Sequence, residues 1–147
     1  MIELYTIGFT QKKAERFFGL LKEHDVTMLV DTRLKPDVQL SGFAKKNDLP
    51  YFMIEIVGGS YIHLPELSPT PDILDTYRAD KDWQKYEIRF NALLDQRNIP
   101  HALDRAMFER ERCCLLCSEH LADRCHRRLV AERLAAEWPT VSITHLH

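Results

Sequence analysis

A cysteine and a glutamate in the last third of the chain have the residue types and spacing for nucleophilic chemistry. Cys117 closes a short apolar run, and Glu119 follows it by two residues. A cysteine at a strand end faces the start of the following helix, where the helix dipole and nearby cations favour the reactive thiolate. Cys117 is therefore a candidate nucleophile and Glu119 a candidate general acid or base. The competing interpretation is that Cys117 is only the small apolar last residue of a buried strand.

Thiol and imidazole groups of the kind that bind zinc are carried by Cys117, Cys125 and His126. Three ligands without a clear fourth are a weak signal, so we assign no metal ligand and identify no cofactor. Metal or iron–sulfur binding through these three residues stays open as an alternative. The string Cys114-x-x-Cys117 does not add to it, because residues three apart on a strand point to opposite faces, roughly 10 Å apart.

Arginines gather where a negatively charged ligand would bind. Arg124 and Arg127 fall in the first turns of a helix predicted over residues 122–137, where cationic side chains oppose the helix dipole. An anionic ligand at this helix start would account for them. A solvated face with Asp123 and Glu132 as ion-pair partners accounts for them equally well.

The other candidates follow the ends of predicted strands, and in open parallel sheets ligands bind beyond the carboxyl ends of the strands. Asp31 and Arg33 follow one strand, although an aspartate there also suits a loop cap with the arginine as its partner. We expect one pocket at this edge of the sheet. Its catalytic candidates are Asp31, Cys117 and Glu119, and its ligand-binding candidates are Gly8, Thr10, Arg33, His63, Glu66, Arg124, Cys125, His126 and Arg127.

These positions depend on an alternation of strands and helices. Apolar, β-prone runs predict strands over residues 2–7, 26–30, 61–64, 113–117 and 141–144. Helical spacing and capping residues predict helices over residues 11–24, with Thr10 as the cap, and over residues 49–57, 83–97 and 122–137. A further helix begins at residue 70, and a turn or two of helix is predicted near residues 102–107. Residues 34–47 are predicted to form a surface loop. The sequence predicts a single α/β domain over residues 1–147, three-layered and Rossmann-like, with a mostly parallel sheet of about five strands and helices on both faces.

Composition limits the class of protein further. The 147 residues carry 20 Lys and Arg against 22 Asp and Glu, a net charge of -2, and 45% are hydrophobic. This excludes a disordered chain and disfavours a protein that holds long duplex DNA through phosphate charge. No signal peptide or membrane span is recognised. We therefore expect a cytoplasmic protein whose four cysteines are reduced and form no disulfide.

Four motifs occur in an order that resembles a known family. They are Tyr5-Thr6-Ile7-Gly8, Val30-Asp31-Thr32-Arg33, His63-Leu64-Pro65-Glu66-Leu67, and Leu116-Cys117-Ser118-Glu119 followed by Arg124-Cys125-His126-Arg127. The chain resembles the bacterial and archaeal domain-of-unknown-function family 488, which implies a three-layer α/β fold with these motifs around one pocket. Phe9 stands where that family usually has a histidine, and Ser68 where it usually has a glycine.

These observations support a pocket for an anionic, nucleotide-like or nucleic-acid-end ligand, on which Cys117 acts as nucleophile. A non-catalytic module that senses a nucleotide or nucleic acid is an alternative, as is the metal or iron–sulfur site. The expected partner is a small anionic ligand, a nucleotide or a nucleic-acid end rather than a membrane, and the sequence does not indicate an oligomeric state.

Overall fold

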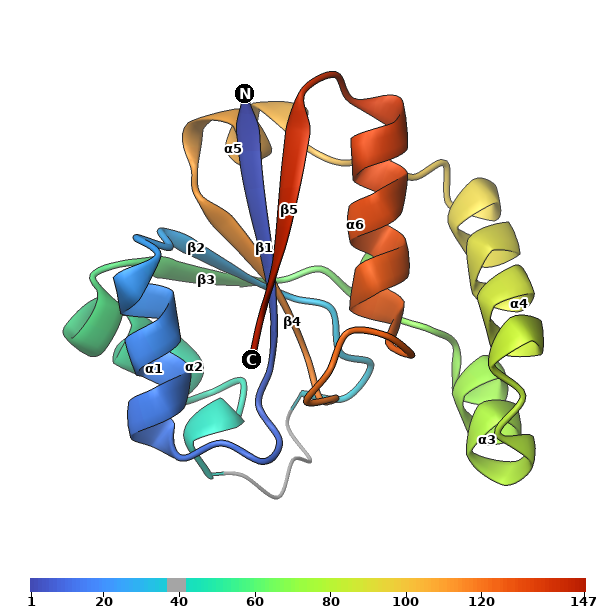
Figure 1. Cartoon of the computed structure of the whole chain (residues 1–147), viewed down its shortest axis with the longest axis horizontal. Coiled ribbons are helices and arrows are strands. Elements are labelled where there is room, and N and C mark those ends of the chain that lie inside the picture. The colour runs from blue at the N-terminus through green and yellow to red at the C-terminus, as the bar shows by residue number, and fades with distance from the viewer. Residues whose placement is uncertain (37–41) are drawn as a thin grey trace.

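A five-stranded parallel sheet forms the centre of the protein, as a computed structural model shows for residues 1–36 and 42–147 (Figure 1). The strands are β1 (Ile2–Gly8), β2 (Met28–Asp31), β3 (Ser60–His63), β4 (Cys113–Cys117) and β5 (Val141–Leu146). Their order is β3-β2-β4-β1-β5, with every pairing parallel. The predicted parallel sheet is confirmed. The strand order of this sheet differs from the 3-2-1-4-5 order of a Rossmann fold in one respect: β1 and β4 have exchanged places.

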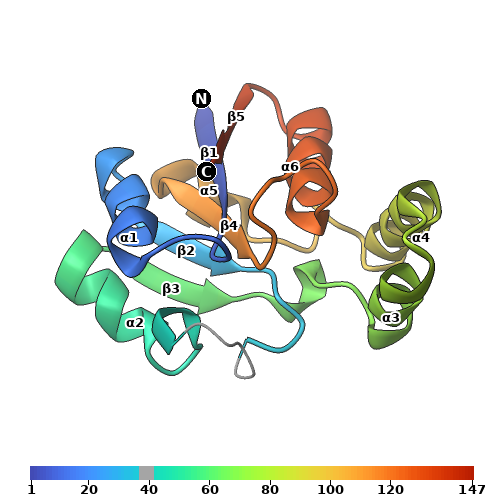
Figure 2. The same ribbon diagram turned by 60° about the horizontal axis from the view of Figure 1, so that its bottom comes forward.

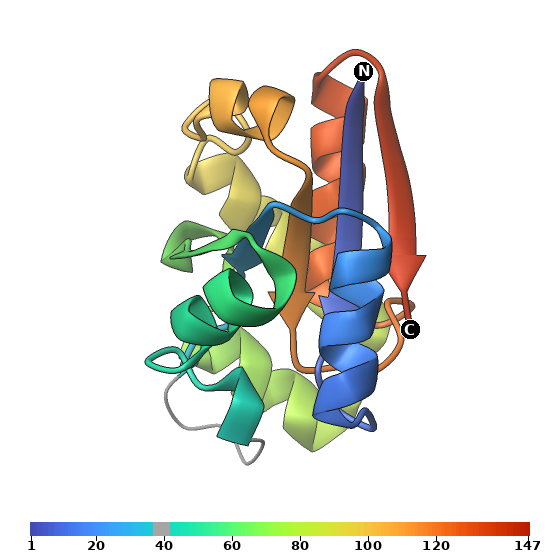
Figure 3. The same ribbon diagram turned by 90° about the vertical axis from the view of Figure 1, so that its left-hand side faces the viewer.

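Helices cover both faces of this sheet, which confirms the three layers. One face carries α1 (Ala14–Glu23), α2 (Leu49–Phe52) and the π-helical turn η2 (Met53–Val57), and this layer faces the viewer in Figure 3. The other face carries α3 (Pro71–Asp80), α4 (Trp83–Gln96), α5 (Arg105–Arg110) and α6 (His126–Glu137). Short 3-10 turns, η1 (Gly42–Ala44) and η3 (Pro65–Leu67), complete the elements. Within the described ranges, no helix is long and apolar enough to cross a membrane.

The central strand β4 contributes to both hydrophobic cores. All five of its residues are buried, as expected for a strand covered on both faces. Cys113 and Leu115 join the core beneath α4 and α6, whereas Cys114 and Leu116 join the core beneath α1. This alternation confirms that Cys114 and Cys117 point to opposite faces of the sheet, so the two thiols do not form a joint site.

Capping residues fix the start of α3, where the Thr70 hydroxyl accepts a hydrogen bond from the Ile73 amide and Pro71 occupies the first turn. The short helix predicted over residues 49–57 is also confirmed, and Gly58 ends it with a φ of 79°. The predicted loop over residues 34–47 includes η1, and its residues 37–41 lie outside the described residues.

Two helix starts differ from the prediction. Thr10 does not cap α1, which begins at Ala14; its hydroxyl donates instead to the Ser118 carbonyl at 2.7 Å. The last helix begins at His126 rather than near residue 122, with Cys125 at the N-cap position. Residues 118–125 therefore form a loop after β4, and the contacts of this loop with neighbouring side chains outweigh its helical spacing.

Gly8 allows the end of β1 to approach this loop closely. Gly8 pairs with Cys117 in the sheet, and the Phe9 amide donates to the Cys117 carbonyl at 3.3 Å. A Cβ atom on Gly8 would overlap the backbone carbonyl of Glu119. The absence of a side chain at Gly8 is thus required by the path of the loop.

We predict that Gly8→Ala destabilises the protein by about 3 kcal/mol or more, because backbone atoms must shift to admit the methyl group. Gly19→Ala is the matched control. Gly19 lies in the exposed part of α1, and a Cβ there meets nothing within 4 Å. That substitution is expected to stabilise the protein by roughly 0.5–1 kcal/mol. Urea unfolding of the two variants measures both effects, and a neutral Gly8→Ala would contradict the close approach.

Candidate functional site

A cavity of about 540 Å³ lies beyond the carboxyl ends of β2 and β4. Figure 2 brings this edge of the sheet forward and shows the loops that follow β2 and β4, with α3 farther out on the same side. The cationic side chains that line the cavity are Arg33, Lys35, Arg78, Lys81 and Arg124, and the acidic ones are Asp75 and Glu119. The described lining therefore carries more positive than negative charge.

Arg33 is held rigidly at this edge by a buried aspartate. The Nε and Nη2 atoms of Arg33 donate to the two carboxylate oxygens of Asp31 at 2.8 and 2.7 Å, and the Tyr61 hydroxyl donates to the same carboxylate at 2.5 Å. The guanidinium also lies over the Phe9 ring, with 5.3 Å between Cζ and the ring centroid. Burial and the Asp31 carboxylate raise the pKa of Tyr61, which keeps its hydroxyl protonated as a donor.

One nitrogen of Arg33 remains unused by this network. Arg33 is 3% exposed, and its Nη1 atom has no hydrogen-bond partner among the described residues. A buried N–H without an acceptor is costly, and the cost is greater for a charged group. Arg33 is also one of the residues that line the cavity.

The second buried arginine, Arg127, has a different role. Its side chain is 0% exposed, and Nη1 donates to the Glu119 carbonyl at 2.5 Å while Nη2 donates to the His120 carbonyl at 3.3 Å. Nε donates to the Thr6 hydroxyl at 3.2 Å. Burial lowers the pKa of Arg127 to about 10, so the guanidinium stays charged at neutral pH. Arg127 does not line the cavity; it fastens the loop after β4 to β1 and α6.

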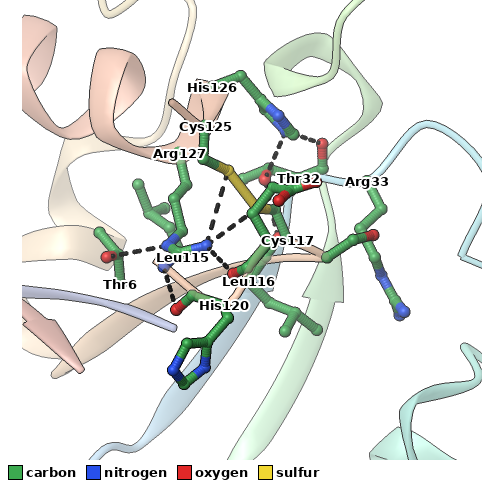
Figure 4. The surroundings of a disulfide bond; sticks show 12 residues. Thr6, Thr32, Arg33, Leu115, Leu116, Cys117, His120, Cys125, His126 and Arg127 are labelled. Atoms are coloured by element: carbon green, nitrogen blue, oxygen red, sulfur yellow. Dashed lines mark hydrogen bonds between the residues drawn. A yellow bond between two sulfur atoms is a disulfide. The ribbon is translucent and has the colours of Figure 1, made fainter. Parts of the chain in front are cut away.

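Cys117 and Cys125 lie side by side at the floor of the cavity, where the structure joins them as a disulfide (Figure 4). This corrects the expectation that none of the four cysteines forms a disulfide, although Cys113 and Cys114 are free. Sequence spacing could not reveal the pairing, because it depends on the loop that returns Cys125 to the strand end. Arg127 Nη1 donates to both sulfur atoms, at 3.2 Å to Cys117 and 3.6 Å to Cys125.

His126 completes this floor. Its Nε2 atom donates to the Thr32 carbonyl at 2.8 Å. Burial lowers the pKa of His126 to about 4, so the imidazole is neutral at physiological pH. The donor atoms of Cys117, Cys125 and His126 all lie within 4.8 Å of one another.

The structure thus brings part of the predicted site together. The predicted residues that line the cavity are Arg33, Cys117, Glu119, Arg124, Cys125 and His126. Asp31 contacts Arg33, and Gly8, Thr10 and Arg127 contact the loop after β4, but none of these four residues lines the cavity itself.

Two further predicted residues lie elsewhere. His63 Nε2 donates to the Arg33 carbonyl at 2.8 Å, and the imidazole lines a separate depression with Tyr61. Glu66 offers its backbone carbonyl to Arg97 at 2.8 Å and lines neither cavity within the described part of the chain. Glu119 stands at the exposed rim rather than in a dry pocket.

Sequence reasoning missed the wall that α3, the start of α4 and the loop after β2 contribute. This wall includes Lys35, Tyr77, Arg78, Lys81 and Tyr86. Arg78 and Lys81 are three residues apart, which places them near each other on a helix. That spacing is the only signal in the sequence, and it does not show where the helix packs.

Fold and site together define an α/β protein with a cation-rich cavity at the carboxyl ends of a parallel sheet. Within that class, the chain belongs to the family described as Domain of unknown function DUF488, whose model matches residues 13–134. The resemblance seen in the sequence motifs is thereby confirmed at the level of the family. Neither a curated protein nor a solved structure matches the chain.

The Asp31–Arg33 pair is testable by a double-mutant cycle. Either Asp31→Leu or Arg33→Met leaves one buried charge without its partner, and we expect a loss of about 3–5 kcal/mol for each. The double variant should lose much less than the sum of the two. Urea unfolding of all four proteins gives the coupling energy.

A control cycle on the exposed pair Arg105–Glu109 should give a coupling energy of only about 0.3–0.5 kcal/mol. Additive losses for Asp31 and Arg33 would show that the buried pair is not a coupled unit.

Proposed function

We propose that the cavity binds a small anionic ligand of the nucleotide class, with a phosphate group placed against Arg33. The observation that carries this proposal is the Nη1 atom of Arg33, which is buried and has no hydrogen-bond partner among the described residues, in a residue that lines the cavity. A phosphate oxygen would supply the acceptor, and charge-assisted hydrogen bonds of this kind are stronger than neutral ones.

The charge of the lining supports an anion rather than a cation. Lys35, Arg78, Lys81 and Arg124 stand with Arg33 around the opening, against the two carboxylates of Asp75 and Glu119. The Asp31 carboxylate neutralises Arg33 in an ion pair, so the excess positive charge comes from the other four cations, and Arg33 contributes a directed N–H donor. The imidazole of His126, being neutral, neither adds to the charge nor opposes it.

The wall formed by α3 and α4 supports a ligand larger than inorganic phosphate. Tyr77 and Tyr86 line it together with Leu74, and two prolines are adjacent. Burial raises the pKa of Tyr86, which keeps this ring neutral. Aromatic and apolar surface opposite a phosphate contact suits the base or sugar of a nucleotide, or the end of a nucleic-acid strand.

Binding, rather than turnover, is the function proposed. In the structure the Cys117 sulfur is bonded to Cys125, so nucleophilic attack by Cys117 requires reduction of that bond first. Glu119 has no dry surroundings that would tune it as an acid or base. A cytoplasmic location and catalysis by the reduced thiol stay predictions from the sequence.

The proposal predicts that inorganic phosphate raises the melting temperature of the protein and that adenosine monophosphate raises it more. A ligand that binds only the folded state stabilises it by about 2.7 kcal/mol at a hundred times its Kd. Uncharged adenosine should raise the melting temperature far less, because it lacks the phosphate. Thermal unfolding at fixed, moderate salt measures all three.

Two substitutions test the role assigned to Arg33. Arg33→Ala should lose roughly 1.5–3 kcal/mol of binding free energy for adenosine monophosphate, measured by calorimetry under conditions where the variant is folded. Arg124→Gln removes a cation at the exposed rim and leaves no buried carboxylate unpaired, so it should lose less. Arg110→Ala, just before the opposite end of β4, serves as the control and should bind like the wild type. Equal affinities in all four proteins would refute a phosphate contact at Arg33.

A further inference from the structure

We propose that Cys117, Cys125 and His126, in the reduced protein, bind a zinc ion whose fourth coordination position opens into the cavity. The starting observation is that the donor atoms of these three residues lie within 4.8 Å of one another. This inference concerns a metal site and does not depend on whether the cavity also binds an anion.

The donor set suits zinc. Two thiolates and one imidazole, with a fourth position left open, form one of the known ligand sets of catalytic zinc. With metal–sulfur bonds of about 2.3 Å and a metal–nitrogen bond of about 2.0 Å, ligand atoms around one ion lie roughly 3.4–3.8 Å apart. Small side-chain movements from the observed positions achieve this. All three residues line the cavity, so the open position faces it.

The hydrogen bonds of His126 leave one of its ring nitrogens free to bind a metal. The Thr32 carbonyl can only accept, so the 2.8 Å hydrogen bond from Nε2 fixes the proton on that nitrogen. In the neutral ring, Nδ1 then carries the free lone pair. Metal-binding histidines usually donate their other ring N–H in this way to a carbonyl or carboxylate, which fixes the tautomer.

Arg127 favours thiolates at this place over neutral sulfur. This guanidinium is fully buried and forms no ion pair with an acidic side chain in the described ranges, yet it donates to both sulfur atoms. Buried charges in proteins are normally paired. Thiolates provide the negative charge that a disulfide lacks, and N–H donors to metal-bound sulfur hold such ligands in place.

The backbone spacing also suits a bridge through a metal. The Cα atoms of Cys117 and Cys125 are 7.7 Å apart, beyond the range of about 4.4–6.8 Å usual for a disulfide. A metal between two sulfurs lengthens the bridge and accommodates this separation. An iron–sulfur cluster fits less well, because such clusters usually take four thiolates and Cys113 and Cys114 are buried within β4.

The metal-binding form arises from the disulfide by two-electron reduction. A phosphine reductant cleaves the sulfur–sulfur bond, with water as the oxygen source, and leaves two thiols and the phosphine oxide. Each thiol then loses a proton as zinc binds, so two metal–sulfur bonds form in place of two S–H bonds.

The test is zinc titration of the whole protein, stripped with a chelator and freed of it, in its reduced and its oxidised form without added phosphate. The reduced wild type should retain one zinc per chain after gel filtration, measured by elemental analysis, and the disulfide form should retain none. Cys125→Ala should weaken zinc binding by more than the roughly 10–100-fold typical for loss of an outer-shell contact. Cys114→Ala is the matched control, because it removes a buried free cysteine from the other face of β4, and it should bind zinc normally.

A second measurement uses only the wild type, so it does not depend on the folding of variants. Zinc should protect Cys117 and Cys125 of the reduced protein from iodoacetamide at least tenfold more than it protects Cys113 and Cys114, as mass spectrometry of the peptides would show. Retention of less than half a zinc per reduced chain, or equal weakening by Cys125→Ala and Cys114→Ala, would overturn the site. Because no anion is present, either result leaves the proposed anion binding untouched.

Discussion

The buried guanidinium of Arg127 is the contact on which the geometry of the candidate site depends. It donates to the Thr6 hydroxyl in β1, to the carbonyls of Glu119 and His120 in the loop after β4, and to both sulfur atoms at the cavity floor. Five acceptors from separate segments converge on one planar group, whose donors have a fixed geometry. The loop therefore has no freedom to continue α6 backward as a helix, and its path in turn excludes any side chain at Gly8.

Arg33 shows the opposite use of the same side chain. Its carboxylate partner Asp31, the Phe9 ring and the Tyr61 hydroxyl hold the guanidinium in one orientation. Only Nη1 lacks a partner in the described part of the chain. Immobilising a cation before a ligand arrives lowers the entropy lost on binding. One buried arginine thus supports the floor of the cavity, and the other is the residue that we propose contacts the ligand.

Phe9 gives a physical meaning to a departure from the family pattern. The position after Gly8, where the family usually has a histidine, holds a phenyl ring that packs against the Arg33 guanidinium. Such a ring attracts the cation through its face but neither donates nor accepts a proton. In this chain the position therefore supports the arginine, and the imidazole nearest the cavity is that of His126.

The periodicity of apolar residues was sufficient to predict the alternating strands and helices and the parallel sheet, because these depend on local spacing. Strand-end position was sufficient to place Arg33 and Cys117 at one edge of the sheet, because parallel strands share one direction. Tertiary structure decided everything that depends on contacts between distant segments. It separated the roles of Arg33 and Arg127, which look alike in the sequence, because only the latter finds a full set of acceptors. It also brought Cys125 back to Cys117 and placed Arg78 of α3 and the adjacent Lys81 on the cavity wall. The path of a loop and the docking of a helix follow from packing rather than from spacing.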